Sequence, residues 1–149
     1  MPETKSDRIA PVRKSITVPW KAEVAFRRFT AGIGEWWPLS SHSVSESADA
    51  SVSFEPRVGG RIAETAPDGA EHLWGTVTAW DPPRRVAFTW HPGQPADTRQ
   101  EVAVAFHPAD DGTRVELVHS GWEHLGEKAA GMRAGHDSGW DFVLGRYSG

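Results

Sequence analysis

The sequence contains no cysteine. This absence excludes a disulfide framework, thiolate zinc or iron–sulfur sites and a cysteine nucleophile. The chain also has no apolar run near the roughly 20 residues that a membrane-spanning helix requires, so we predict no membrane partner. The polar first residues 1–8 lack the apolar segment of a signal peptide. We therefore expect a cytoplasmic protein.

Basic residues do not form a continuous stripe. The formal net charge is -4, and Arg27-Arg28 and Arg84-Arg85 are isolated pairs, so we expect no nucleic-acid partner. With 149 residues, one domain can bury roughly 68–70% of its unfolded surface. We predict a single domain over residues 1–149, with residues 1–9 as a flexible N-terminal tail.

Tyrosine is scarce, but tryptophan is abundant. The chain has one tyrosine, six phenylalanines and eight tryptophans. An indole carries a large apolar area and one hydrogen-bond donor, which suits cores and pockets alike. We expect most of the tryptophans in the core and a few around a pocket.

The first part of the chain shows a strand, two short helices and a loop. Residues 16–18 alternate as a half-buried strand does, and Pro19 ends it. Residues 21–30 have apolar residues at helical spacing. A second short helix is predicted to carry Ile33, Trp36 and Trp37, one indole facing inward and the other on the surface. Residues 40–50 read as a surface loop.

From residue 52 the hydrophobic period becomes two, which predicts antiparallel hairpins. The first pairs residues 52–55 with 62–64 around Gly59-Gly60. In the second, residues 72–80 and 86–91 flank a proline turn, and we expect rungs that pair Ala79 with Val86, Val77 with Phe88 and Gly75 with Trp90.

The last hairpin brings a histidine onto the apolar face. Residues 101–106 and 114–119 are predicted to pair Phe106 with Val115, Val104 with Leu117 and Val102 with His119. Two interpretations of His119 stay open: a buried residue bonded to backbone or water, or a polar anchor at one end of an apolar pocket.

A long C-terminal helix follows from Glu123. Its glycines Gly131, Gly135 and Gly139 lie on one face, and each weakens a helix by roughly 0.8–1.0 kcal/mol relative to alanine. We expect this face to approach the sheet or a bound molecule closely. Helices at both ends of an antiparallel run predict an α+β fold with a curved sheet around the long helix.

The ordered motifs of the chain resemble the SRPBCC, or START-like, superfamily of helix-grip folds, in its branch of homologues of the activator of heat-shock-protein ATPase. The resemblance spans roughly residues 10 to 147. It rests on Val18-Pro19, Val24-Ala25-Phe26, Phe29-Thr30, Trp36-Trp37, Gly59-Gly60-Arg61, Trp74-Gly75-Thr76-Val77, Asp81-Pro82-Pro83-Arg84-Arg85, Phe88-Thr89-Trp90, Gly112-Thr113, His119-Ser120-Gly121-Trp122 and Gly139-Trp140.

This resemblance implies a seven-stranded sheet that grips the C-terminal helix, with a cavity that in many relatives holds a lipid, sterol, polyketide or other apolar molecule. No catalytic residue set is shared across the superfamily. Eukaryotic members of the branch stimulate a chaperone ATPase within a longer, two-domain protein.

Between sheet and helix we predict a ligand-binding cavity and no catalytic, metal or cofactor site. His119, His124 and His136 lack the helical spacings of known metal sites. Ser120 beside His119 makes no triad, because neighbours on a strand point to opposite faces. The predicted cavity-lining residues are Trp36, Phe54, Val77, Phe88, Trp90, Val104, Leu117, His119, His136 and Trp140.

Three functions remain open. The leading one is binding of a hydrophobic or aromatic small molecule. The second is a chaperone-stimulating or other protein-interaction module, with a role in the stress response, acting as a monomer or homodimer. The third is a cyclase or aromatase in which His119 or His136 acts as general acid or base.

Overall fold

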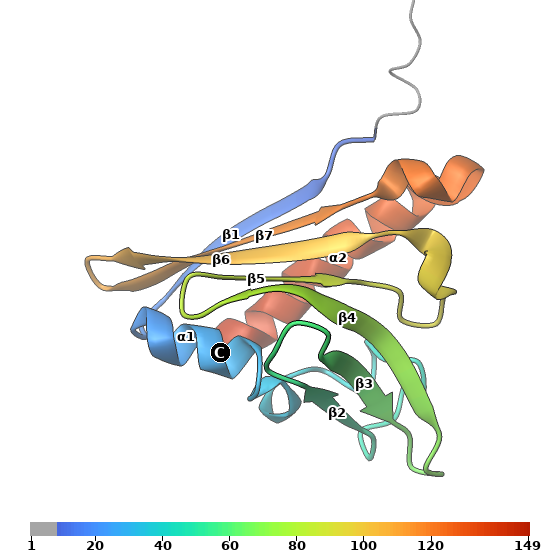
Figure 1. The fold of residues 1–149 in the computed structure, drawn as a ribbon, viewed down its shortest axis with the longest axis horizontal. Helices are drawn as coiled ribbons and strands as arrows, with labels where there is room; N and C mark the ends of the chain where they lie inside the picture. Colours follow the sequence, from blue (N-terminus) through green and yellow to red (C-terminus); the bar gives the residue numbers. More distant parts are fainter. Residues whose placement is uncertain (1–8) are drawn as a thin grey trace, which may run out of the picture.

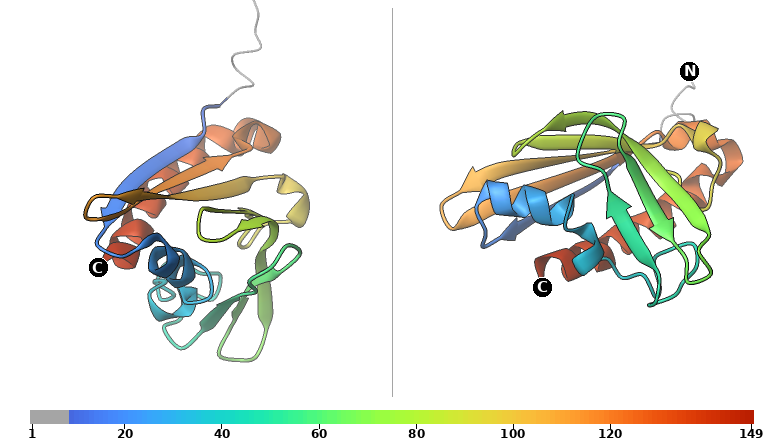
Figure 2. Two further views of the ribbon diagram at one scale, coloured as in Figure 1. Left: turned by 60° about the vertical axis from the view of Figure 1, so that its left-hand side comes forward. Right: turned by 60° about the horizontal axis from the view of Figure 1, so that its bottom comes forward.

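One antiparallel sheet with a long helix across one face makes up the fold (Figures 1 and 2). The computed structural model describes residues 9–149, so the tail predicted over residues 1–9 lies outside the described residues except for Ile9. The elements in chain order are β1 (Val12–Val18), α1 (Ala22–Phe29), η2 (Ile33–Glu35), β2 (Ser51–Phe54), β3 (Arg61–Thr65), β4 (Glu71–Asp81), β5 (Arg85–Thr89), η3 (Ala96–Thr98), β6 (Glu101–Ala109), β7 (Gly112–Ser120), η4 (Trp122–Lys128) and α2 (Ala129–Ser148).

The sheet has the spatial order β1-β7-β6-β5-β4-β3-β2, and every neighbouring pair is antiparallel. Only β1 leaves the sequential order, because it pairs with β7 at one edge while α1, η2 and the following loop carry the chain to the other edge. The predicted α+β helix-grip fold, with seven strands and two short helical segments after the first strand, is confirmed.

The sequence-based pairing is confirmed for one hairpin and needs correction for another. β6 and β7 pair as predicted, including Val102 with His119. Between β4 and β5, Val77 pairs with Phe88 as predicted, but Ala79 pairs with Ala87 instead of Val86. The turn occupies only residues 82–84, and an irregularity between positions 77 and 79 restores the register.

The third predicted rung of this hairpin, Gly75 with Trp90, is wrong because β5 ends at Thr89. A Cβ atom on Gly75 would lie 1.8 Å from the carbonyl oxygen of Thr89. The two strands therefore approach too closely at this point for any residue with a side chain.

The segment after α1 also differs from expectation. η2 is a single turn that ends at Glu35, and both Trp36 and Trp37 follow it. The expectation that one of these indoles packs on the surface is wrong, because both are buried. Once the helix has ended, the 100° offset between adjacent helical residues no longer applies.

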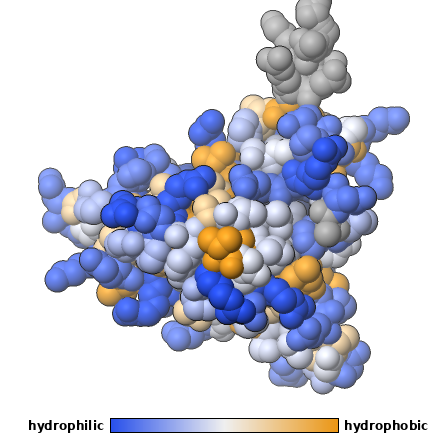
Figure 3. All heavy atoms as spheres, in the orientation of Figure 1, coloured by the Kyte–Doolittle hydropathy of each residue, from blue (hydrophilic) through white to orange (hydrophobic). Residues whose placement is uncertain are grey.

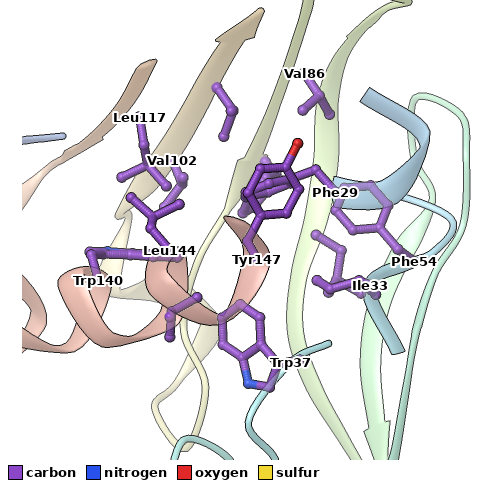
Figure 4. Packing of buried hydrophobic residues seen from close by; sticks show 14 of the residues in the cluster. Phe29, Ile33, Trp37, Phe54, Val86, Val102, Leu117, Trp140, Leu144 and Tyr147 are labelled. Carbon is purple, nitrogen blue, oxygen red and sulfur yellow. The ribbon is translucent and has the colours of Figure 1, made fainter. Parts of the chain in front are cut away.

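The core lies between the concave face of the sheet and α2. Figure 4 shows Trp140 and Leu144 of α2 pointing toward Val102 and Leu117 of the sheet, with Tyr147 turned toward Phe29 of α1. Full burial of one such apolar side chain contributes roughly 1.5–3 kcal/mol. This packing fixes which face of α2 is turned inward.

Polar contacts fix the middle and the C-terminal end of α2. The Lys14 ammonium of β1 lies 2.5 Å from an Asp137 carboxylate oxygen and 2.9 Å from one of Asp141, both in the middle of the helix. At the C-terminal end, the Tyr147 hydroxyl donates a hydrogen bond of 2.7 Å to the carbonyl of Ala25 in α1. The helix is therefore held along its length, and the side chains on its inner face have fixed positions.

The face of the molecule seen in Figure 3 is mainly hydrophilic, and hydrophobic residues appear there as separate spots among polar ones. Among residues 9–149, no helix has the length and apolarity needed to span a membrane.

Candidate functional site

A pocket of about 590 Å³ lies between α2 and the two loops that follow η2 and β5. This volume falls within the range of small-molecule sites, roughly 300–1,000 Å³. Its lining residues come from three segments of the chain: Trp37, Ser41, His42, Ser43 and Val44; Trp90, Pro92, Gly93 and Gln94; and Met132, Gly135, His136, Gly139, Trp140 and Val143.

Three indoles form its apolar wall. The ring centroids of Trp90 and Trp140 lie 5.5 Å apart, and those of Trp37 lie 5.8 Å from Trp90 and 6.0 Å from Trp140. None of these pairs is parallel, so the wall presents both faces and edges of aromatic rings. Such a wall suits an apolar, aromatic ligand.

Two loops form the outer side of the pocket. A Cβ atom on Gly93 would lie 3.8 Å from a methyl group of Val44, so the two loops come close together at this point. The His42 ring stacks on Phe142 of α2, with centroids 4.8 Å apart and an angle of 11°. Ser41, Val44 and Gly93 are exposed, so the pocket opens to solvent between them.

Glu64 of β3 holds one of these loops from behind. Its buried carboxylate accepts hydrogen bonds from the backbone N–H of Val44 at 2.8 Å, from the N–H and hydroxyl of Ser45, and from the Trp74 indole N–H at 3.2 Å. Burial raises the pKa of Glu64, but the hydrogen bonds together outweigh burial, and the net pKa is lowered. An ionised carboxylate thus fixes the loop that carries Val44.

His119 lies beneath the pocket and is fully buried. The Trp140 indole N–H donates to its Nδ1 at 3.0 Å, so Nδ1 is the acceptor and the proton resides on Nε2, which donates to Oε1 of Gln100 at 2.8 Å. Burial, and secondarily the neighbouring His136, lowers the pKa of His119 to about 3. The ring is therefore neutral and fixes the orientation of the Trp140 indole.

His136 of α2 lies one layer closer to the pocket. Its Nδ1 is 2.9 Å from the carbonyl oxygen of Met132, one helical turn earlier, and must therefore carry the proton. Its Nε2 is hydrogen-bonded to no residue in the range 9–149. Burial lowers the pKa of His136, although the Met132 carbonyl acts in the opposite direction. The neutral ring thus has an unpaired acceptor nitrogen beside the pocket.

The lining carries no Asp, Glu, Lys or Arg. Within the described part of the chain, no group of three or more His, Asp or Glu side chains is placed to hold a metal ion. The chemistry available at the pocket is therefore apolar contact, hydrogen bonding and proton acceptance by histidine.

The predicted cavity residues divide into two groups. Trp90, His136 and Trp140 line the pocket. The other seven are packed in the core and do not line it: Trp36, Phe54, Val77, Phe88, Val104, Leu117 and His119. The role of all ten in ligand binding stays a prediction.

For the helix glycines, close approach to the sheet, one of the two expected alternatives, is not observed. Cβ atoms on Gly131 and Gly135 would meet nothing within 4 Å, and one on Gly139 would meet only His42. Gly135 and Gly139 line the pocket, whereas Gly131 does not. Two of the three glycines thus leave room at the pocket rather than at the sheet.

The contributions of the loops are not foreseen from the sequence. For Trp37 the sequence predicts only that either it or Trp36 faces inward, and Trp36 is the one named as a cavity residue. The loop residues Ser41, Val44 and Gly93 are not among the predicted site residues. Loop 40–50 has no hydrophobic period, and its placement depends on Glu64, which is distant in sequence. A buried acidic residue in a strand pattern is a weak signal of this arrangement.

The family comparison matches residues 20–146 to the family described as Activator of Hsp90 ATPase homolog 1-like protein. The comparison with curated proteins gave no match.

Among solved structures, an anthrahydroquino-gamma-pyrone synthase, Txn09, is 38% identical, with 92% of this chain and 90% of that chain covered and a TM-score of 0.61. CalC, a self-sacrificing resistance protein from Micromonospora echinospora, is 28% identical, with coverages of 93% and 92% and a TM-score of 0.71. The Aha1 dimer from Colwellia psychrerythraea is 18% identical, with coverages of 94% and 94% and a TM-score of 0.69, and shows the shared fold.

Proposed function

The chain belongs to the family of Activator of Hsp90 ATPase homolog 1-like proteins, and we propose that it binds a hydrophobic, aromatic small molecule in the pocket between α2 and the two loops. The observation that carries this proposal is the wall of three indoles around a space of about 590 Å³. Aromatic walls with a few polar groups are typical of small-molecule sites.

Two relatives support a small-molecule function. The 38% identical protein is named as a synthase and was solved as a complex, and the 28% identical protein is named as a resistance protein. These names describe those proteins, and they favour small-molecule chemistry over a purely structural role for this chain.

The first test compares the intact mass of freshly purified protein under native and denaturing conditions. Extra mass that disappears on unfolding supports a carried ligand and gives its molecular weight. Identical masses leave the site to be tested with an added probe.

A matched pair of variants then tests the pocket itself, with the neutral fluorescent probe N-phenyl-1-naphthylamine. Gly135→Leu places a side chain in the pocket, and Gly131→Leu makes the same change one turn earlier on α2, outside it. We expect the probe to bind the wild type and Gly131→Leu, and to be lost from Gly135→Leu. Equal binding to both variants, or no binding to the wild type, contradicts the proposal.

A cyclase activity is the second candidate, favoured by the 38% identity to a synthase. Of the two histidines that we considered as acid or base, His119 uses both ring nitrogens within the core. The role would therefore fall to His136, which lines the pocket. Mass spectrometry of an aromatic polyketide precursor incubated with the protein tests this, since ring closure with dehydration removes one water.

Chaperone stimulation and a homodimeric state stay predictions. The family description supports the first, and the Aha1 protein from Colwellia psychrerythraea, described as a dimer, supports the second. Measurement of chaperone ATPase rates with added protein tests the first, and light scattering tests the second.

A further inference from the structure

The polar groups of the pocket differ in their capacity to form hydrogen bonds with a ligand. Most are already hydrogen-bonded within the protein: the Ser43 hydroxyl donates to the Leu39 carbonyl at 2.6 Å, and the Trp37 indole N–H donates to the His42 carbonyl at 2.7 Å. The Ser41 hydroxyl is bonded to Nδ1 of His42 at 2.7 Å. These groups shape the wall but have little remaining capacity for a ligand.

Among the residues that line the pocket, His136 has a vacant acceptor and packs against buried side chains. Its ring centroid lies 5.1 Å from that of His119 and 5.3 Å from that of Trp122, both fully buried side chains. The Met132 carbonyl fixes the tautomer with Nε2 unprotonated. His42 and Gln94, by contrast, lie on the solvent-exposed loops at the rim.

The surroundings disfavour an anionic ligand. No Asp, Glu, Lys or Arg side chain lines the pocket, and the ionised carboxylate of Glu64 lies directly behind the Val44 segment of the wall. An anion would lose its hydration without gaining a cationic partner, which is costly in an apolar site.

We propose that Nε2 of His136 accepts a hydrogen bond from a hydroxyl group on the bound molecule, so that the pocket selects uncharged aromatic compounds with a free hydroxyl, the phenol class. This inference rests on the proposed function, since it assigns the polar specificity of the same pocket. A phenol has a pKa near 10, as tyrosine does. Because the pKa of His136 is lowered by burial, the proton stays on the ligand oxygen, and the ligand is bound as a neutral donor.

Four probes with the same ring system separate the contributions of apolar contact, hydrogen-bond donation and negative charge to ligand affinity. They are naphthalene, 2-naphthol, 2-methoxynaphthalene and 2-naphthoate, each titrated by calorimetry. We expect 2-naphthol to bind the wild type roughly 3- to 10-fold more tightly than 2-methoxynaphthalene, which is the range of one net hydrogen bond. We expect 2-naphthoate to bind more weakly than naphthalene. His136→Phe keeps a planar ring without the acceptor and should bring the ratio of naphthol to methoxynaphthalene affinity to about one, while His136→Gln, which offers an amide oxygen, should retain part of it.

A second measurement does not depend on the folding of any variant. In long-range ¹H–¹⁵N spectra of the wild type, the Nε2 resonance of one histidine should move on addition of 2-naphthol and not on addition of 2-methoxynaphthalene. If no neutral probe binds, both the proposed function and this inference are wrong. If the neutral probes bind with equal affinities, or the ratio persists in His136→Phe, the pocket function stands and the role of His136 is overturned.

Discussion

Acidification from pH 7 to pH 5 should destabilise this protein, because His119 is buried as a neutral ring. Its pKa is lowered from 6.5 to about 3 by burial and then by the neighbouring His136. Between these values the unfolded chain binds a proton that the folded protein does not, so the contribution of His119 is fully present above pH 6.5 and is lost as the pH falls. Each pH unit in this window costs about 1.36 kcal/mol, so His119 alone should remove about 2 kcal/mol between pH 7 and pH 5.

The assay is urea unfolding followed by tryptophan fluorescence at pH values from 5 to 8.5, for the wild type and for His119→Gln. A glutamine amide offers an acceptor oxygen and a donor NH₂ group, so it can keep partners at Trp140 and Gln100 without titrating. We expect the two stability curves to be parallel above pH 7.5 and to converge by about 2 kcal/mol between pH 7 and pH 5. His136 also has a lowered pKa, so the comparison with the variant, and not the wild-type curve alone, isolates His119. Curves that stay parallel down to pH 5 would refute the neutral, buried state of His119.

Three substitutions test the parts that hold the pocket. Glu64→Gln removes the negative charge that accepts hydrogen bonds from the Val44–Ser45 segment. We expect the free energy of unfolding in urea to fall by about 2 kcal/mol and N-phenyl-1-naphthylamine to bind more weakly. Unchanged probe affinity would show that the position of the loop does not depend on the Glu64 carboxylate. Tyr147→Phe removes one buried hydrogen bond to Ala25 and should cost about 1 kcal/mol while leaving probe binding intact. Gly131→Ala adds a methyl group that meets nothing within 4 Å, so it should stabilise the protein by about 0.8–1.0 kcal/mol, and a destabilised variant would contradict the open environment of this glycine.

The β6–β7 and β4–β5 hairpins show how far strand pairing can be predicted from the local alternation of apolar and polar residues. In β6 and β7 the alternation of apolar residues is continuous on both strands, so a one-residue slip would turn apolar residues away from the buried face. All three predicted rungs are present. In β4 and β5 the irregularity beside Val77 moves Ala79 to a different partner. An extra residue in a strand leaves the overall period intact on each side, so pattern alone does not locate it.

The pocket was predictable only where it is built from regular elements. Trp140 and His136 lie on a helix whose inner face is defined by its apolar stripe, and Trp90 directly follows β5. The loop residues Val44 and Gly93 come close together because of contacts between distant parts of the chain. Such contacts depend on side-chain hydrogen bonds to backbone groups, which leave no periodic trace in the sequence.

The two inner histidines show why residue type alone could not assign roles in this site. His119 and His136 are 5.1 Å apart, and burial lowers the pKa of both, so both rings are neutral near pH 7. They differ in how their second nitrogen is used: His119 has a partner at each nitrogen, whereas Nε2 of His136 has none among the described residues. A fully bonded histidine can only orient its neighbours, and here it orients Trp140 in the wall. A half-bonded histidine at the same wall retains an acceptor for whatever enters, and this difference makes His136 the residue on which specificity should depend.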